Sequence, residues 1–235
     1  MGATSTPRVR KPAHAQAFTR KLLAWWTRAA RDLPWRRTRD PYRVLVSEFM
    51  LQQTQVSRVA EYYPRFLERF PDLGALARAP ARAVREAWDG LGYYARARNL
   101  HRLAKEVSGV GCQVPDDPAE LIKLPGVGPY TAGAVASFAY EKPVPAVDTN
   151  VARVIRRVFF ASRLPHPASR QIWELTRILV PKNGKRAWRF NQAIMELGAL
   201  ICVARKPKCP ECPVKPNCKT GRRLGVRQTA RRRDG

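Results

Sequence analysis

Four cysteines close to the C-terminus are the residues best suited to hold a metal. Cys202, Cys209, Cys212 and Cys218 form the pattern C-x6-C-x2-C-x5-C, with four prolines in the chain between them. Four thiolates within one short loop can surround a tetrahedral zinc ion or a cubane iron–sulfur cluster. The spacing alone does not choose the metal, so the sequence predicts a centre of either kind. The fifth cysteine, Cys112, is distant and is predicted to be a packing or surface thiol.

Two acidic residues lie in surroundings that should favour opposite charge states. Glu48 falls within the apolar stretch of residues 44–51, where burial disfavours the carboxylate and lets the acid hold and donate a proton. Asp148 precedes a helical pattern that begins at Thr149, and a helix N-terminus favours the ionised carboxylate. Structural interpretations also exist, Glu48 as a paired buried acid and Asp148 as an N-cap. Together, a proton donor and an anion form the pair that glycosidic cleavage uses.

The segment from Leu121 to Ala136 predicts a hairpin of two helices. Its turn contains Gly126, Val127 and Gly128, two glycines around one small apolar residue. Such a turn permits a tight backbone in which consecutive N–H groups point outward at the start of a helix. These groups can bind DNA phosphates without reading base sequence. A helical junction that binds no ligand is the alternative interpretation.

The charge of the chain indicates which partners it attracts. Its 44 Lys and Arg residues against 18 Asp and Glu give a net charge of +26, which favours polyanions. Nucleic acid is preferred over acidic proteins or a membrane, and no apolar run approaches the roughly 20 residues of a spanning helix. The N-terminus has no apolar core of a secretory signal. We therefore expect a reducing, cytoplasmic compartment, in which dense cysteines bind metal rather than form disulfides.

The elements that must position these groups are helices. Apolar residues recur at helical spacing, strand signals are nearly absent, and we expect an all-α protein of about ten helices. Helix starts are predicted after Asp40, Asp117 and Asp148, and helix ends near Gly90, Gly109, Pro143 and Gly184. Residues 1–14 and 221–235 are basic and without periodicity, which predicts a tail at each end.

Longer motifs in this chain resemble those of one protein family. They are LPWR at residues 33–36, SEFMLQQTQV at 47–56, GLGYYARARNL at 90–100, LPGVGPYTAGAV at 124–135, VDTNVARV at 147–154 and FNQAIMELGALIC at 190–202. Together they resemble the adenine glycosylases of the MutY family, in the helix-hairpin-helix superfamily that includes endonuclease III. The resemblance runs from about Phe18 to Cys218, and the cysteine spacing is similar to that of the family's [4Fe-4S] loop.

The resemblance implies a fold and a domain organisation. The implied fold is that of helix-hairpin-helix DNA glycosylases, in which a six-helix domain packs against a helical iron–sulfur domain with the active site in the cleft between them. We expect the six-helix domain at residues 41–148 and the iron–sulfur domain at residues 15–40 together with 149–220. The family usually carries a further C-terminal domain that helps recognise 8-oxoguanine, and we expect this chain to lack it.

The resemblance also implies roles for individual residues. Glu48 matches the acid that protonates adenine at N7 and then activates water, and Asp148 matches the carboxylate that stabilises the oxocarbenium-like sugar. Tyr130, Asn150 and Glu196 match the polar residues that surround this pair in the family. Arg31, Trp35 and Leu51 match residues that contact the extruded adenine. Gln53 and Tyr93 match side chains that are wedged into the duplex. Gly126, Val127 and Gly128 match the turn that binds phosphate. Without the resemblance, Gln53 would be placed on a solvated helix face and Tyr93 in the core.

The expected activity is removal of adenine mispaired with guanine or 8-oxoguanine from double-stranded DNA, by a monomer without a small-molecule substrate. Tyr130 stands where related bifunctional glycosylases carry a lysine, so neither a Schiff base nor strand cleavage is expected. One alternative is a thymine or uracil mismatch glycosylase of the same superfamily, which shares this tyrosine. Two others are a non-catalytic iron–sulfur protein that binds DNA and a zinc module. The preference between guanine and 8-oxoguanine is left open.

Overall fold

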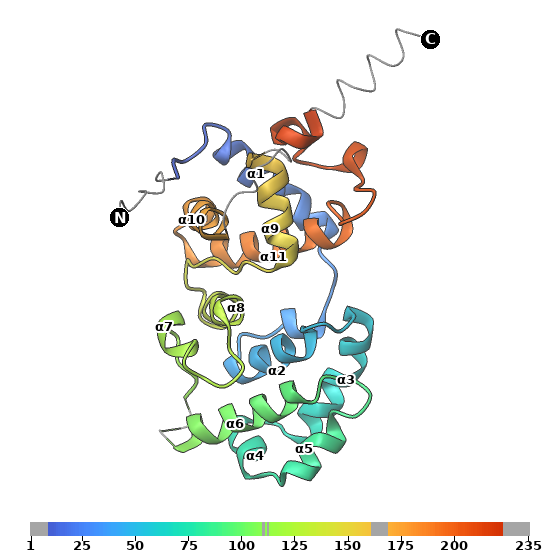
Figure 1. The fold of residues 1–235 in the computed structure, drawn as a ribbon, viewed down its shortest axis with the longest axis vertical. Helices are drawn as coiled ribbons and strands as arrows, with labels where there is room; N and C mark the ends of the chain where they lie inside the picture. The colour runs from blue at the N-terminus through green and yellow to red at the C-terminus, as the bar shows by residue number, and fades with distance from the viewer. Residues whose placement is uncertain (1–8, 110, 112, 161–168, 223–235) are drawn as a thin grey trace, which may run out of the picture. The chain divides into compact units, whose positions relative to one another are not determined.

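The computed structural model describes residues 9–109, 111, 113–160 and 169–222 (Figure 1). Within these ranges every regular element is a helix and no strand occurs, which confirms the predicted all-α class. None of the described helices is long and apolar enough to cross a membrane. Cys112, residues 1–8 and residues 223–235 lie outside the described residues, and so do the predictions made for them.

The described residues form α-helices joined by loops and short helical turns. In chain order the α-helices are α1 (Ala15–Ala29), α2 (Pro41–Leu51), α3 (Val56–Arg69), α4 (Leu73–Arg78), α5 (Ala81–Ala87), α6 (Ala95–Gly109), α7 (Pro118–Leu121), α8 (Pro129–Tyr140), α9 (Thr149–Ile155), α10 (Ser169–Leu179) and α11 (Gly184–Leu200). Short 3-10 helices are η1 (Pro34–Arg36), η3 (Cys209–Glu211) and η4 (Lys215–Asn217), and η2 (Arg156–Phe160) is a π-helical turn.

Side-chain caps fix several helix starts. Asp40, Asp117 and Asp148 each accept a backbone N–H of the first turn through Oδ1, at 2.8, 2.9 and 2.6 Å, which confirms the three predicted starts. The predicted helix end at Gly184 is wrong, because this residue begins α11. The reason is Asn183, whose Oδ1 accepts the N–H of Arg186 at 3.0 Å and caps the helix.

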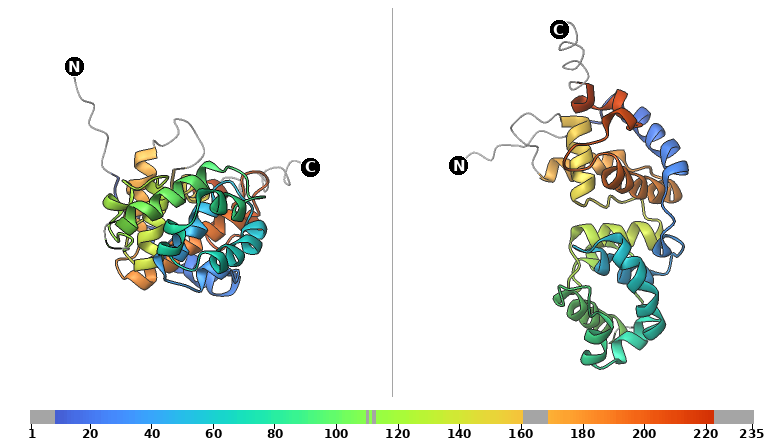
Figure 2. Two further views of the ribbon diagram at one scale, coloured as in Figure 1. Left: turned by 90° about the horizontal axis from the view of Figure 1, so that it is seen from below. Right: turned by 90° about the vertical axis from the view of Figure 1, so that its right-hand side faces the viewer.

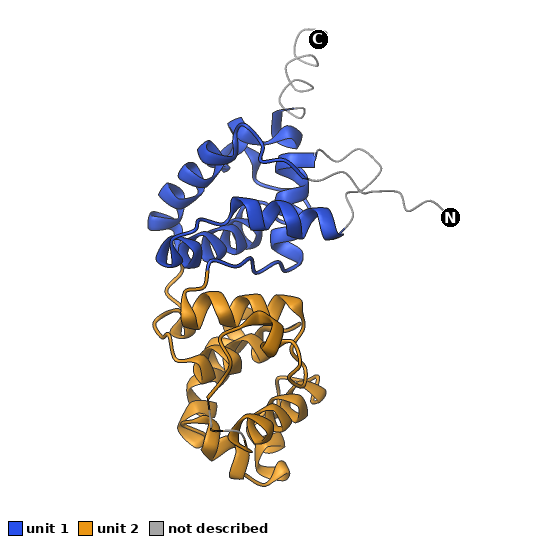
Figure 3. Ribbon diagram, turned by 90° about the vertical axis from the view of Figure 1, so that its left-hand side faces the viewer, with its two compact units in different colours: residues 1–30, 143–235 blue, residues 31–142 orange. Residues whose placement is uncertain are grey.

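The chain folds into two compact units, which Figure 3 shows in different colours. Unit 1 comprises residues 1–30 and 143–235, and unit 2 comprises residues 31–142. The chain passes from unit 1 to unit 2 after residue 30 and returns after residue 142. Both boundaries lie earlier in the chain than the domain boundaries expected after residues 40 and 148. Residues 31–40 belong to unit 2 because Trp35 packs edge-on against Tyr63 of α3, with ring centroids 5.7 Å apart. Residues 143–148 belong to unit 1 because Asn191 of α11 donates to the carbonyl oxygen of Val144 at 2.8 Å.

Helix α2 forms the centre of unit 2. All its residues from Tyr42 to Met50 except Arg43 are buried, and it contacts α3, α6 and α8. Helix α8 packs beside it, and its residues from Thr131 to Ala139, most of them small, are all buried, so the two helix axes can approach closely. Helices α4 and α5 pack on α6.

Helix α11 forms the centre of unit 1 and contacts α1 and α9 (Figure 2). Phe190 is fully buried there, and Phe18 of α1 meets it edge-on with ring centroids 6.5 Å apart. Gly198 marks the closest approach of α11 to α9, because a Cβ atom at this position would lie 2.7 Å from the Cβ of Asn150. The absence of a side chain at Gly198 thus lets the two helices meet.

Parts of both predicted tails are attached to unit 1. The N–H of Val9 donates to Oε1 of Glu174 at 3.3 Å, and the ring of His14 stacks on Phe159 at 5.1 Å. Near the other end, residues 219–222 form a helical turn. Val9 and His14 of the first expected tail, and Gly221 and Arg222 of the second, therefore contact unit 1.

Candidate active-site residues and cysteine centre

Glu48 lies in the buried central helix of unit 2. Its side chain is 3% exposed, and the residues one turn before it in α2, Val44 and Leu45, are 2% and 0% exposed. The carboxyl group therefore stands in an apolar helix with little access to water. Surroundings of this kind suit a carboxylic acid that keeps a proton and later donates it.

The predicted hairpin is formed by α7, a turn and α8. Gly126 in the turn has φ +77°, and a Cβ there would lie 2.8 Å from the Cβ of Asn99 and 2.9 Å from Cε1 of Phe49. Only glycine meets both conditions, which lets the turn pack on α2 and α6. Gly128 is the N-cap of α8 and has no atom within 4 Å of the place a Cβ would occupy, so the helix start is open there. Val127 is buried, and Tyr130 is half-buried in the first turn of α8.

Two loops of unit 2 present non-glycine residues in the left-handed conformation. Gln53 follows α2 with φ +57°, and Tyr93 precedes α6 with φ +48°. Both side chains are exposed, and Tyr93 is 60% exposed. The alternative placement of Tyr93 in the core is therefore wrong. A non-glycine residue in this conformation costs energy and often marks a functional loop.

The three residues expected to contact an extruded base also lie in unit 2. Trp35 is 8% exposed, and Leu51 is the half-buried last residue of α2. Arg31 is half-buried, and its carbonyl oxygen accepts a hydrogen bond from Nη1 of Arg36 at 3.0 Å.

Asp148 lies in unit 1 as the N-cap of α9. Its Oδ1 accepts the N–H of Val151 at 2.6 Å, and its Oδ2 accepts Nδ2 of Asn150 at 2.9 Å. Both carboxylate oxygens are thus held by neutral donors at the positive end of a helix. Glu196 is 1% exposed in α11, the helix whose Gly198 packs on Asn150.

Two arginines continue from this carboxylate toward the cysteines of the same unit. Arg153 donates from Nη2 to Oδ1 of Asn150 at 2.6 Å and from Nε to the carbonyl oxygen of Cys202 at 2.8 Å. Burial lowers the pKa of its guanidinium group. Arg157 of η2 donates from Nη1 to the Sγ of Cys202 at 3.4 Å and to the carbonyl oxygen of Val203 at 2.8 Å. Asp148 and the first cysteine are therefore joined by an unbroken hydrogen-bonded path.

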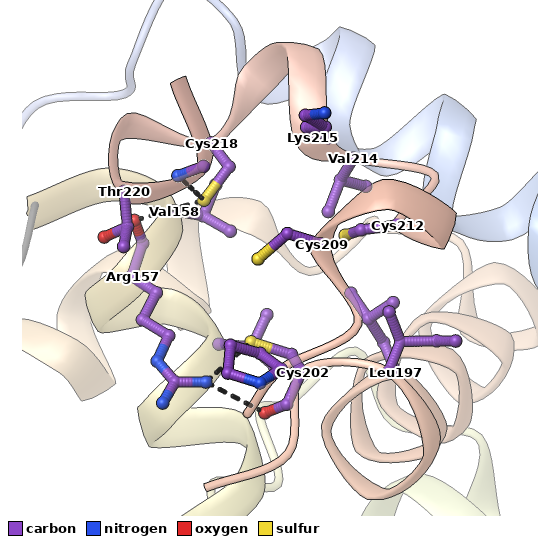
Figure 4. Close-up of a pocket in the computed structure, with 14 residues that line it drawn as sticks. Arg157, Val158, Leu197, Cys202, Cys209, Cys212, Val214, Lys215, Cys218 and Thr220 are labelled. Carbon is purple, nitrogen blue, oxygen red and sulfur yellow. Dashed lines mark hydrogen bonds between the residues drawn. The ribbon is translucent and has the colours of Figure 1, made fainter. Parts of the chain in front are cut away.

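The four cysteines line one cavity in unit 1, which Figure 4 shows in close-up. The cavity is partly open to solvent. Its other walls come from η2, α11 and the loop that carries the cysteines, through Val158, Leu197 and Val214 among others. The first thiol accepts a hydrogen bond from Arg157, and the N–H of Gly221 donates to the Sγ of Cys218 at 3.2 Å.

The thiols face apolar surroundings that disfavour a free thiolate. Burial raises the pKa of Cys212 to about 11, and it also raises the pKa of Cys218. Thiolates at this place therefore need a bound cation. In the described part of the chain, however, no group of three or more His, Cys, Asp or Glu residues is placed to hold a single metal ion.

The predicted site residues are divided between the two units. Unit 2 holds Glu48, Tyr130 and the residues expected to contact bases and phosphates, and unit 1 holds Asp148, Asn150, Glu196 and the cysteines. The meeting of Glu48 and Asp148 at one site stays a prediction.

Comparison with known proteins gives the family. Residues 46–177 match the model of the family described as HhH-GPD superfamily base excision DNA repair protein. An adenine DNA glycosylase of Mycobacterium tuberculosis (strain ATCC 25618 / H37Rv) is 44% identical over 211 residues, which cover 88% of this chain and 68% of that relative. This chain belongs to the adenine DNA glycosylases of the HhH-GPD superfamily.

Other members and solved structures extend the comparison. The adenine DNA glycosylases of Homo sapiens and Rattus norvegicus are 42% and 43% identical over 93% and 91% of this chain, but the chain spans only 42% and 43% of their lengths. A thermostable thymine-DNA glycosylase superposes with a TM-score of 0.81 and 33% identity, over 89% of this chain and 97% of its own. A non-covalent Endonuclease III-DNA complex superposes with a TM-score of 0.78 and 25% identity, over 93% and 100%.

The structure also shows contacts of residues that the sequence did not single out. Arg153 and Arg157 follow Asn150 by three and seven residues, a spacing that places all three on one helical face and could have revealed them. Gly198 gave no signal, because its role depends on a helix distant in sequence. Arg96 lies in a basic stretch that resembles a solvated surface, yet it is 7% exposed.

Proposed function

We propose that this protein hydrolyses the N-glycosidic bond of adenine mispaired with guanine or 8-oxoguanine in double-stranded DNA. The observation that carries the proposal is Glu48, a carboxyl group that is 3% exposed in the central helix of unit 2. It lies within residues 46–177, the segment that matches a base excision repair family. A protein that only binds DNA needs no proton donor at this position.

In the proposed mechanism the two carboxyl groups act on the same extruded nucleotide. Glu48 donates a proton to N7 of adenine, which makes the base a better leaving group, and the C1′–N9 bond breaks. Asp148, held by Val151 and Asn150, stabilises the positive charge that develops on the sugar. Glu48, now a carboxylate, accepts a proton from water as the water attacks C1′, leaving an abasic site. The mechanism requires that both groups reach one sugar.

The remaining predicted residues are proposed to bind the DNA. The backbone of Gly126, Val127 and Gly128, at the open start of α8, binds phosphate. Arg31, Trp35 and Leu51 contact the extruded base. Tyr130, Asn150 and Glu196 form the polar shell around Glu48 and Asp148. Gln53 and Tyr93, the exposed loop residues, fill the place that the base leaves.

Tyr130 supports a hydrolytic reaction without strand cleavage. Its phenol occupies the first turn of α8, at the position where a lysine would be needed to attack the sugar as an amine. A phenol forms no Schiff base. The product is therefore an abasic site in an intact strand.

We further propose that Cys202, Cys209, Cys212 and Cys218 hold a [4Fe-4S] cluster. Support comes from four thiols that line one cavity, with donors from Arg157 and Gly221 to two of the sulfurs. The cysteine spacing, which is similar to that of the family's [4Fe-4S] loop, favours a cluster over one zinc ion. When bound, the cluster supplies iron–thiolate bonds that fasten the loop to unit 1.

A thymine or uracil mismatch glycosylase is the second candidate. The observation in its favour is the thermostable thymine-DNA glycosylase, of whose length this chain covers 97%. The identity to that protein is 33%, against 44% to the mycobacterial adenine enzyme, so adenine is preferred.

Excision assays on four duplexes test the proposal. Wild-type protein, Glu48→Gln and Glu61→Gln are incubated with A:8-oxoG, A:G, T:G and U:G pairs, and abasic sites are counted after alkali treatment. We expect excision only of adenine, lost in Glu48→Gln with duplex binding retained, and unchanged in Glu61→Gln, whose carboxylate is exposed on α3. Excision of thymine or uracil alone would establish the second candidate, and no excision by the wild-type protein would refute both.

A further inference from the structure

Arg96 is a buried cation that makes an unusual number of backbone contacts. It is the second residue of α6 and 7% exposed. Its guanidinium group donates to five carbonyl oxygens: from Nη1 to Phe49 at 3.0 Å, to Met50 at 2.8 Å and to Gln52, and from Nη2 to Leu91 at 3.1 Å and to Gly92 at 3.0 Å. Burial lowers the pKa of this group, so its charge is kept against an unfavourable environment.

The five acceptors belong to two separate segments. One is the C-terminal end of α2, where the last carbonyl groups of a helix have no partner within the helix. The other is the loop between α5 and α6. A planar guanidinium group with donors on both sides can join two segments in this way, whereas a lysine presents its donors from one point. Arg96 therefore fixes the end of α2 against the start of α6.

Each joined segment leads directly into an exposed left-handed residue. Gln52 accepts from Arg96 and is followed by Gln53 at φ +57°, and Gly92 accepts from it and is followed by Tyr93 at φ +48°. The Tyr93 ring centroid also lies 5.4 Å from Cζ of Arg96. Strained residues keep their conformation only where the surroundings fix it, and one guanidinium group fixes both.

We propose that Arg96 is a positioning residue that sets the conformation and spacing of Gln53 and Tyr93 for insertion into a DNA duplex. Arg96 is too buried to contact DNA, and it acts through the two loops. The part that concerns insertion rests on the proposed function, whereas the part that concerns the loops does not. If Arg96 contributed only to general stability, its replacement would destabilise all of unit 2 to a similar extent. A positioning role and a general stabilising role can therefore be distinguished.

Amide hydrogen exchange without DNA tests the loops alone. Arg96→Lys and Arg96→Met are compared with Arg98→Lys and Arg98→Met, the matched changes at an exposed residue of α6. In Arg96→Lys we expect the amides of Thr54 and Leu91, which close the two turns, to exchange about tenfold faster or more, with α3 and α8 unchanged. Unchanged exchange in both turns, or an equal rise throughout unit 2, would overturn the proposal.

Excision and base extrusion test the consequence for DNA. A 2-aminopurine beside the target adenine reports extrusion by its fluorescence, and single-turnover excision is measured at saturating protein. We expect Arg96→Lys to bind the duplex within about threefold of wild type and to lose extrusion and excision by about 10²-fold, since small misplacements have effects of this size.

Adding Tyr93→Ala to Arg96→Lys should cause little further loss, because both changes remove the same function. Additive losses would refute the coupling. If the wild-type protein excises nothing, the proposed function fails while the exchange data still decide the role of Arg96.

Discussion

Replacing Gly198 by alanine should displace the start of α9 and with it Asp148. In an ordinary helix interior this change stabilises a protein by about 0.5–1 kcal/mol. Here the new Cβ would lie 2.7 Å from the Cβ of Asn150 and 3.2 Å from its Cα and carbonyl carbon, and distances below 3.0 Å essentially never occur. Two of the three contacts are to backbone, so a helix must move, at a cost of about 1–3 kcal/mol. The net loss of stability therefore lies between roughly 0 and 2.5 kcal/mol, with about 1 kcal/mol expected near the middle of that range.

Thermal unfolding and single-turnover excision measure the two consequences of Gly198→Ala. We expect Tm to fall by about 2–6 °C in a protein of this size. Because Asn150 donates to Asp148 at 2.9 Å, moving it should shift the carboxylate and reduce the excision rate on the order of 10-fold to 10²-fold. Gly109→Ala is the control, since a Cβ there has no atom within 4 Å. A Gly198→Ala protein with a raised Tm and normal excision would show that the two helices are not in close contact.

Three further predictions concern the metal, the product and alkaline pH. The purified protein should absorb visible light, and Cys212→Ser should remove that absorption and lower Tm; a colourless wild-type protein containing zinc would contradict the cluster. Borohydride should trap no covalent protein–DNA adduct during excision, and a stoichiometric adduct would disprove the role given to Tyr130. Burial raises the pKa of Tyr63 from 10.0 to about 12, so its neutral form stabilises the fold below pH 10 and this contribution is lost as pH rises toward 12. Tyr63→Phe should therefore lose less stability than wild type over that window in urea unfolding.

Local patterns in the sequence predicted the features that depend on neighbours along the chain. The caps at Asp40 and Asp148 follow from the residue type before a helical run, and each is seen in the structure. The burial of Glu48 follows from the apolar residues one turn away. These features need no knowledge of the tertiary structure, which is why they could be inferred.

Features that depend on distant segments could not be predicted in this way. Residues 31–40 pack with α3 in unit 2 because Trp35 meets Tyr63, a contact that no local pattern indicates. Gly184 was expected to end a helix, and the cap supplied by Asn183 makes it a start. The contacts of Arg96 depend on the fold in the same manner.

Arginines that are buried or half-buried and bond to backbone carbonyls determine how salt should act on this protein. Arg96 donates to carbonyls at the end of α2, and Arg153 and Arg157 donate to the carbonyl of Cys202, so few of these bonds involve a group that titrates. With a net charge of +26, carboxylates are scarce, and helix-end carbonyls are the abundant acceptors. Partly buried bonds are screened little by salt, whereas DNA association through exposed cations releases counterions and weakens steeply. Raising the salt should therefore increase Kd while the excision rate at saturating protein stays constant. A saturating rate that falls with salt would mean that exposed ion pairs hold the site together.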